Sequence, residues 1–218
     1  IAGGKGGVGK SVICASLAIE LARKHLRVVV VDLDLGAANL HTLLGLIHPS
    51  RTLADWQLDR SRPMAEFLLD TGIPGLEFLS GAGAILETAR FKSEAKGELY
   101  RALMGLDADV VLFDLGAGTH HDILDFFDLA GHRIVVTGPE PTSIQNAYGF
   151  VKAAIYRRLE VAFGDDTGVR ALLTRAIRPR GDDRLETSDA LLEALATARP
   201  EHGARARSTA RNSAAQHG

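Results

Sequence analysis

The sequence predicts an α/β protein whose doubly wound, mostly parallel sheet carries helices on both faces. Two observations predict it: short β-branched runs that lack polar alternation, and segments of helical periodicity between them. Uninterrupted apolar runs are typical of strands that other elements cover on both faces, as in a parallel sheet. Strands that alternate with helices are joined by right-handed crossovers, and such connections build a doubly wound sheet.

The individual strands and helices follow from local patterns. Strands are predicted where the chain reads RVVVVD, LEFL, VVLFD and RIVVT, at residues 27–32, 76–79, 110–114 and 133–137. Apolar residues at helical spacing predict helices at residues 11–25, 98–106, 142–159, 169–177 and 188–197. The helix at 142–159 follows Pro141, and its predicted N-cap is Thr142 or Ser143.

Composition and charge exclude several classes of protein. The chain has 218 residues, of which 46% are hydrophobic and 24% charged, as in ordinary globular proteins. A net charge of −2 provides no overall positive field that would draw the molecule to nucleic acid or anionic lipid. The single cysteine, Cys14, excludes an intrachain disulfide or CxxC site, so we expect a cytoplasmic protein. No apolar run approaches the roughly 20 residues that span a bilayer.

We expect one domain at residues 1–198 and a disordered tail at residues 199–218. The tail lacks periodic apolar residues and carries four arginines against one glutamate. We interpret it as a solvated basic tail rather than a nucleic-acid-binding arm. The chain begins at Ile1, without a methionine and almost on top of a glycine-rich motif, so we expect a preceding segment to be missing.

The glycine-rich motif at residues 4–11 reads GKGGVGKS and fits the phosphate-binding pattern G-x-x-x-x-G-K-[ST]. Gly6, Gly7 and Gly9 can take positive φ angles, so that backbone N–H groups surround phosphate oxygens at the start of the next helix. Lys10 is then placed to reach the outer phosphates, and the Ser11 hydroxyl to coordinate Mg²⁺. The alternative is a glycine-rich turn that happens to contain lysine and serine.

A second lysine, Lys5, stands early in this loop. The resulting KGGVGKS resembles the deviant Walker A motif of the MinD, ParA and FlhG ATPases. That resemblance implies a P-loop NTPase fold of the SIMIBI type, ATP as the nucleotide, and an ATP-dependent homodimer in which Lys5 reaches the partner's nucleotide. A lysine merely exposed at the loop entrance is the alternative. The nucleotide-binding residues predicted in this way are Gly4, Lys5, Gly6, Gly7, Val8, Gly9, Lys10, Ser11 and Asn39.

Two acids follow the strand at 27–32, where open α/β sheets bind ligands. Asp32 and Asp34 fall on the same side of an extended strand. The family pattern is similar through Asp32, Asp34, Gly36, Asn39 and Leu40, and implies that Asp34 positions the attacking water while Asp32 lies nearer the Mg²⁺ ion. Asn39 is placed near the γ-phosphate or the partner subunit. Either aspartate could instead cap the following turn.

Asp114 ends the apolar run VVLF and has the form of a Walker B acid, which holds Mg²⁺ directly or through water. The predicted metal ligands are therefore Ser11, Asp32 and Asp114. The following Gly116-Ala117-Gly118 allows a turn that can sense the γ-phosphate, and family members commonly show the D-x-x-A-G pattern that this chain has here.

These motifs predict an ATPase that binds Mg-ATP, dimerises, and hydrolyses slowly as a switch in the positioning of flagella, division machinery or chromosomes. The predicted catalytic residues are Lys5, Lys10 and Asp34, and an activating or cargo protein is the expected partner. Three alternatives stay open: a non-hydrolysing adaptor, an iron–sulfur carrier of the related Mrp group, and a ParA-like DNA binder. Cys14 alone cannot supply a CxxC, which disfavours the carrier.

The resemblance covers residues 1–159, and its segments VDLDLGAANLHTLLGL and PEPTSIQNAYGFVKAA favour the MinD and FlhG branch over plasmid ParA. The chain shows no late strand with the asparagine-bearing segment through which relatives read adenine, so we expect the sheet to be truncated at this end too. No basic amphipathic helix is found near the C-terminus, so membrane association would need a segment absent from this sequence.

Overall fold

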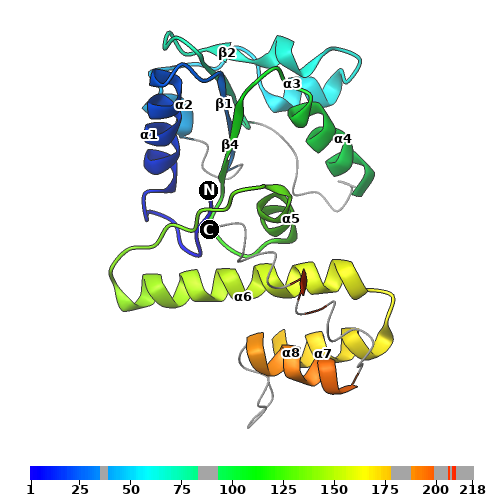
Figure 1. The fold of residues 1–218 in the computed structure, drawn as a ribbon. Coiled ribbons are helices and arrows are strands. Elements are labelled where there is room, and N and C mark those ends of the chain that lie inside the picture. The colour runs from blue at the N-terminus through cyan, green and yellow to red at the C-terminus, as the bar shows by residue number, and fades with distance from the viewer. Residues whose placement is uncertain (35–38, 83–92, 178–187, 199–205, 207, 210–218) are drawn as a thin grey trace. The chain divides into compact units, whose positions relative to one another are not determined.

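The computed structural model describes residues 1–34, 39–82, 93–177, 188–198, 206, 208 and 209 (Figure 1). The chain divides into two compact units. The first comprises Ile1–Gly118 and Ile134–Pro139, and the second comprises Thr119–Arg133 and Glu140–Gly218. The domain predicted at residues 1–198 stays a prediction. Most of the predicted tail lies outside the described residues, although Ala206 is helical and buried.

The first unit is built on a sheet whose strand order is β2-β3-β1-β4. β1 (Val28–Leu33) pairs in parallel with β3 (Leu76–Leu79) and with β4 (Val110–Leu115). The short edge strand β2 (Leu69–Asp70) is antiparallel to β3. All six residues of β1 are buried, as their uninterrupted β-branched run predicts for a central parallel strand. The parallel strands predicted from the apolar runs at 27–32, 76–79 and 110–114 are therefore confirmed.

The first three residues extend this sheet beyond β4. Leu115 N donates to Ile1 O at 2.9 Å, and on the other side Val136 N donates to Ala2 O at 2.8 Å. The strand predicted at 133–137 is wrong in extent, because its pairing is a single parallel bridge between Ala2 and Val135. Gly3 still forms a parallel bridge with Ala117, and the turn into the glycine-rich loop begins at residue 4.

Helices lie on both sides of the sheet. α1 (Lys10–Arg23) packs against β1, β3 and β4, and Figure 1 shows α4 (Ser93–Met104) on the other side of these strands. This arrangement confirms the predicted α/β architecture. The described part of the unit also contains three short helical segments that the sequence patterns did not predict: α2 (Leu40–Leu43), α3 (Leu53–Leu58) and the 3₁₀ helix η1 (Met64–Phe67).

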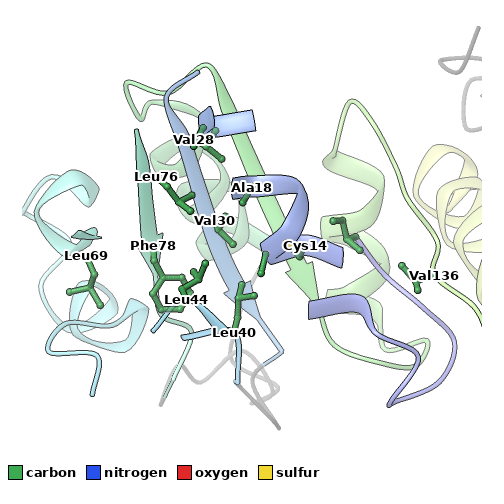
Figure 2. Packing of buried hydrophobic residues seen from close by; sticks show 13 residues of the cluster. Cys14, Ala18, Val28, Val30, Leu40, Leu44, Leu69, Leu76, Phe78 and Val136 are labelled. Carbon is green, nitrogen blue, oxygen red and sulfur yellow. The ribbon is translucent and has the colours of Figure 1, made fainter. Parts of the chain in front are cut away.

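The core of the first unit fills the space between α1 and the sheet. Figure 2 shows Cys14 and Ala18 of α1 in one cluster with Val28 and Val30 of β1 and Phe78 of β3. Small residues on the buried side of α1 let the helix approach the sheet closely. Burial raises the pKa of the Cys14 thiol to about 12, so this cysteine is a neutral core residue, as the sequence suggests.

The second unit is helical in its described part. α6 (Pro141–Phe163) packs against α5 (His121–Leu129) and α7 (Thr167–Ile177), and α7 packs against α8 (Ser188–Ala198). The N-cap of α6 is Glu140 rather than the predicted Thr142 or Ser143, because Pro141 occupies the first helical position. No helix formed by the described residues has the length and apolar character that a membrane crossing requires.

Candidate nucleotide and magnesium site

The glycine-rich loop leads directly into α1. Gly9 is the N-cap of the helix with φ 92°, and Gly7 has φ 77°, so both adopt the left-handed conformation that glycine favours. Gly6, which was also expected to do so, does not have a positive φ. No side chain caps α1, and its first turn contains no acidic residue. The N–H groups at this positive helix end are therefore available to an anion.

The two lysines of the loop have different surroundings. Lys10 begins α1 and is only 6% exposed, whereas Lys5 is exposed to solvent. The Lys10 chain runs beside Gly3, where an added Cβ would lie 3.3 Å from Lys10 Cδ. The protein thus holds one cation inside the loop and presents the other outward.

Asp114 lies on β4 beside the loop, and its side chain lacks partners. The residue is 1% exposed, and neither carboxylate oxygen has a hydrogen-bond partner. Burial raises the pKa of this carboxyl, and the nearby Ser11 hydroxyl and Lys10 charge oppose that rise. Ser11 and Lys10 are therefore close enough to act on Asp114, although no hydrogen bond of ordinary geometry joins them to it.

Asp32 lies next to Asp114, because the register of β1 and β4 pairs these two residues. Its carboxylate accepts hydrogen bonds from Asp34 N at 3.0 Å and Leu40 N at 3.3 Å. Burial raises the pKa of Asp32 to about 7, against the opposing effect of these backbone donors. Asp32 thereby holds, through these two hydrogen bonds, both ends of the segment from Asp34 to Leu40 that follows β1.

Asp34 and Asn39 stand at the two ends of that segment. Asp34 is half-buried, and its charge contributes to the raised pKa of both Asp32 and Asp114. Asn39 is the exposed N-cap of α2, and its carbonyl oxygen accepts from the Thr42 hydroxyl at 2.6 Å. Gly36, which belongs to the predicted pattern, lies outside the described residues.

Over residues 1–198 the chain matches the family described as the CobQ/CobB/MinD/ParA nucleotide binding domain. It belongs to this family.

Two relatives and one solved structure show what this MinD/ParA-type domain resembles. The antiactivator FleN of Pseudomonas aeruginosa is 35% identical over 153 residues, which make up 70% of this chain and 54% of FleN. The flagellum site-determining protein YlxH of Helicobacter pylori is 32% identical over 157 residues, or 70% of this chain and 51% of YlxH. Cobyrinic acid a,c-diamide synthase from Mycobacterium smegmatis, solved with a bound ATP analog and magnesium, gives a TM-score of 0.56 at 26% identity, covering 70% of this chain and 64% of that one. The chain spans about half the length of these two relatives.

The residues of this MinD/ParA-type domain fit a magnesium nucleotide. Asp114 offers two buried oxygens without partners, which is the state that a metal or its bound water would relieve. Among the described residues, no group of three or more His, Cys, Asp or Glu side chains is arranged to hold a metal. That finding is compatible with Mg²⁺, which usually takes one or two carboxylates and completes its shell with water and phosphate.

The structure adds Gly3 to the site, a residue that the motif pattern did not single out. A Cβ on Gly3 would lie 2.8 Å from Val136 O, closer than real Cβ atoms come to a carbonyl oxygen. Gly3 O also accepts from Gly118 N, so the loop entrance is tied to the turn after β4. The signal in the sequence was the glycine pair at positions 3 and 4, directly ahead of Lys5.

Proposed function

We propose that the chain is the nucleotide-binding part of an ATPase that binds Mg-ATP, dimerises on it, and hydrolyses it slowly as a switch in spatial positioning. The observation that carries the proposal is the buried pair at the loop, Lys10 beside an Asp114 carboxylate without partners. A buried acid without partners beside an uncapped helix N-terminus is a costly arrangement, and a magnesium polyphosphate would satisfy both.

Each residue of the site has a role in this proposal. The N–H groups of the loop and the Lys10 ammonium bind the phosphates, while Ser11 and Asp114 hold Mg²⁺, directly or through water. The bound ion neutralises charge on the phosphate oxygens. Asp34 orients the attacking water, and Asp32 keeps Asp34 in place through the hydrogen bond from Asp34 N. Lys5 is exposed, and we assign it to the nucleotide of a second copy.

The relatives support the positioning role. YlxH is named as a flagellum site-determining protein, FleN as an antiactivator, and the synthase structure holds an ATP analog with magnesium. We infer a cytoplasmic switch of this kind that acts on a protein partner, in flagellar placement, division-site selection or cargo partitioning.

The proposal is tested by titrating the protein with Mg-ATP in a calorimeter and by measuring phosphate release. Wild type should bind Mg-ATP, and Lys10→Ala should weaken binding by about tenfold or more, because a charge-assisted contact is lost. Lys24→Ala, which removes an exposed lysine just past the end of α1, is the matched control and should bind as wild type does.

Hydrolysis separates the switch from a non-hydrolysing adaptor. Asp34→Ala should abolish phosphate release while its affinity for Mg-ATP stays within a few-fold of wild type, since Asp34 acts on water rather than on phosphate. Equal background rates in both proteins would favour the adaptor. Wild type that gives no heat with Mg-ATP would overturn nucleotide binding itself.

A further inference from the structure

The second unit contains a cleft of about 560 Å³ that has no part in the proposed ATPase site. Residues of α5, α6 and α7 form its walls, all within one compact unit. Its volume lies in the range of about 300–1,000 Å³ that is typical of small-molecule sites. Buried Leu124 and Leu173 provide an apolar lining, and Gly149 contributes no side chain.

Tyr156 is the buried polar residue of this cleft. It is only 4% exposed, and its hydroxyl oxygen is buried without a hydrogen-bond partner. A buried hydroxyl is normally paired, so an orphan in a cleft wall indicates a partner that the chain itself does not supply. Burial, together with the nearby Tyr148, raises the pKa of Tyr156 to about 12. The hydroxyl therefore remains protonated and can donate at neutral pH.

Arginine and lysine side chains line the described part of the cleft, and they differ in their partners. Arg157 is neutralised, because it donates to Asp125 at 2.7 Å and to Glu160 at 2.8 Å. Arg170, one helix further along, is exposed and has no ion-pair partner among the described residues. Lys152 adds positive charge, with its Nζ 5.4 Å from the centroid of the Tyr156 ring. Among the lining residues that the structure describes, Glu160 is the only acid, and it is already paired.

We propose that this cleft binds a small organic anion whose carboxylate or phosphate group is carried on an apolar or aromatic body. The Arg170 guanidinium and the Tyr156 hydroxyl bind the charged group, and Leu124 and Leu173 contact the body. An anion satisfies the orphan hydroxyl and the unpaired cation together, whereas a neutral apolar molecule would leave both unsatisfied.

The test is calorimetric titration of the full chain with three probes that share a benzene ring: phenyl phosphate, phenylacetate and benzyl alcohol. We expect at least one of the two anions to bind and the alcohol not to bind. Comparison of the two anions separates phosphate from carboxylate ligands. Arg170→Gln should weaken binding by about tenfold or more, and Tyr156→Phe by about threefold to tenfold, because the first removes a charged donor to the anion and the second a neutral donor.

Two controls keep the test specific. Arg175→Gln makes the same change on an exposed arginine of α7 that does not line the cleft, and should leave affinity unchanged. Tyr156→Phe should melt no lower than wild type, because the hydroxyl that it removes has no partner. The proposal is overturned if neither anion binds, if benzyl alcohol binds as well as the anions, or if anion binding survives Arg170→Gln and is lost in Lys10→Ala.

Discussion

Asp32 and Asp114 are aligned on neighbouring strands, yet their carboxylates have different partners. Asp32 accepts two backbone hydrogen bonds, whereas both oxygens of Asp114 are buried and without partners. The first arrangement fixes the segment that follows β1. In the second, an ionised Asp114 carries an electrostatic cost that protonation or a bound cation relieves. In the proposed ATPase, Asp114 therefore lowers the stability of the metal-free protein and provides the oxygen atoms that bind the metal.

This cost predicts that Asp114→Asn stabilises the metal-free protein. A neutral amide replaces a buried carboxylate, so the free energy of unfolding in EDTA should rise by roughly 1–3 kcal/mol. The same change should remove the tightening of ATP binding by Mg²⁺. Thermal melts in EDTA and ATP titrations with and without Mg²⁺ measure the two effects. A variant that melts lower than wild type at neutral pH would contradict the assignment.

The pH dependence gives an independent check on Asp114. Its pKa in the folded protein is raised above the ordinary value of about 3.9, so above that pH the native state retains a proton that the unfolded state has lost. Its contribution therefore makes the free energy of unfolding fall as the pH rises from about 4 through the raised pKa. Asp114→Asn lacks this titration, so its advantage over wild type should widen with rising pH. A constant difference between pH 4 and pH 8 would argue against the raised pKa.

The sequence identified these acids from their place after apolar runs, but it could not distinguish their roles. The hydrogen bonds of Asp32 depend on where the backbone N–H groups of Asp34 and Leu40 lie after the chain has turned. That geometry is set by tertiary packing. The orphan state of Asp114 is likewise a property of its surroundings, and a motif does not encode it.

Among the structural elements, the entrance to the glycine-rich loop is continuous with α1 and is held by the sheet. Residues 1–3 lie between β4 and the segment containing Val136, and Gly9 then opens α1. Gly3 has room for no side chain, because Val136 O lies 2.8 Å from its potential Cβ. Gly97 in α4 is the opposite case, with open space around its potential Cβ and a helical backbone.

These two glycines predict opposite effects of the same substitution. Gly3→Ala should lower the free energy of unfolding by about 1–3 kcal/mol, the usual cost of overpacking. Gly97→Ala should raise it by about 0.5–1 kcal/mol, because alanine is the better helix former. Urea denaturation of the two variants beside wild type measures both. If both variants changed the free energy of unfolding equally, the prediction would be wrong, because the contact between an added Cβ at Gly3 and Val136 O would then have no energetic cost.

Strands and long helices were predictable where the pattern was strong and local. The runs at 27–32 and 110–114 became β1 and β4, and the helices predicted at 169–177 and 188–197 became α7 and α8. The run at 133–137 is as apolar as a strand, but strand length also depends on the neighbouring segment, which here offers one bridge. The short α2 and α3 are too brief for periodicity to reveal them.

For the chain as a whole, each of the two units has a hydrophobic cluster of its own. One lies between α1 and the sheet, and the other is formed by residues of α6, α7 and α8 together with Ala206. The residues predicted for the nucleotide site, however, all fall in the first unit, which is why the sequence could predict that site but not the cleft of the second. That cleft joins residues up to 55 positions apart that no motif connects.

The proposed dimer depends on Lys5, whose side chain is exposed while Lys10 is buried in the same loop. If Lys5 completes the site of a second copy, Mg-ATP should double the mass seen by light scattering, and Lys5→Ala should abolish the doubling. Nucleotide binding to the Lys5→Ala monomer should persist, because the loop N–H groups and Lys10 remain. Lys24→Ala, again the matched control, should dimerise normally. If calorimetry shows that wild type binds Mg-ATP but its molecular mass does not change, the proposed dimer is refuted and the proposed nucleotide site is not.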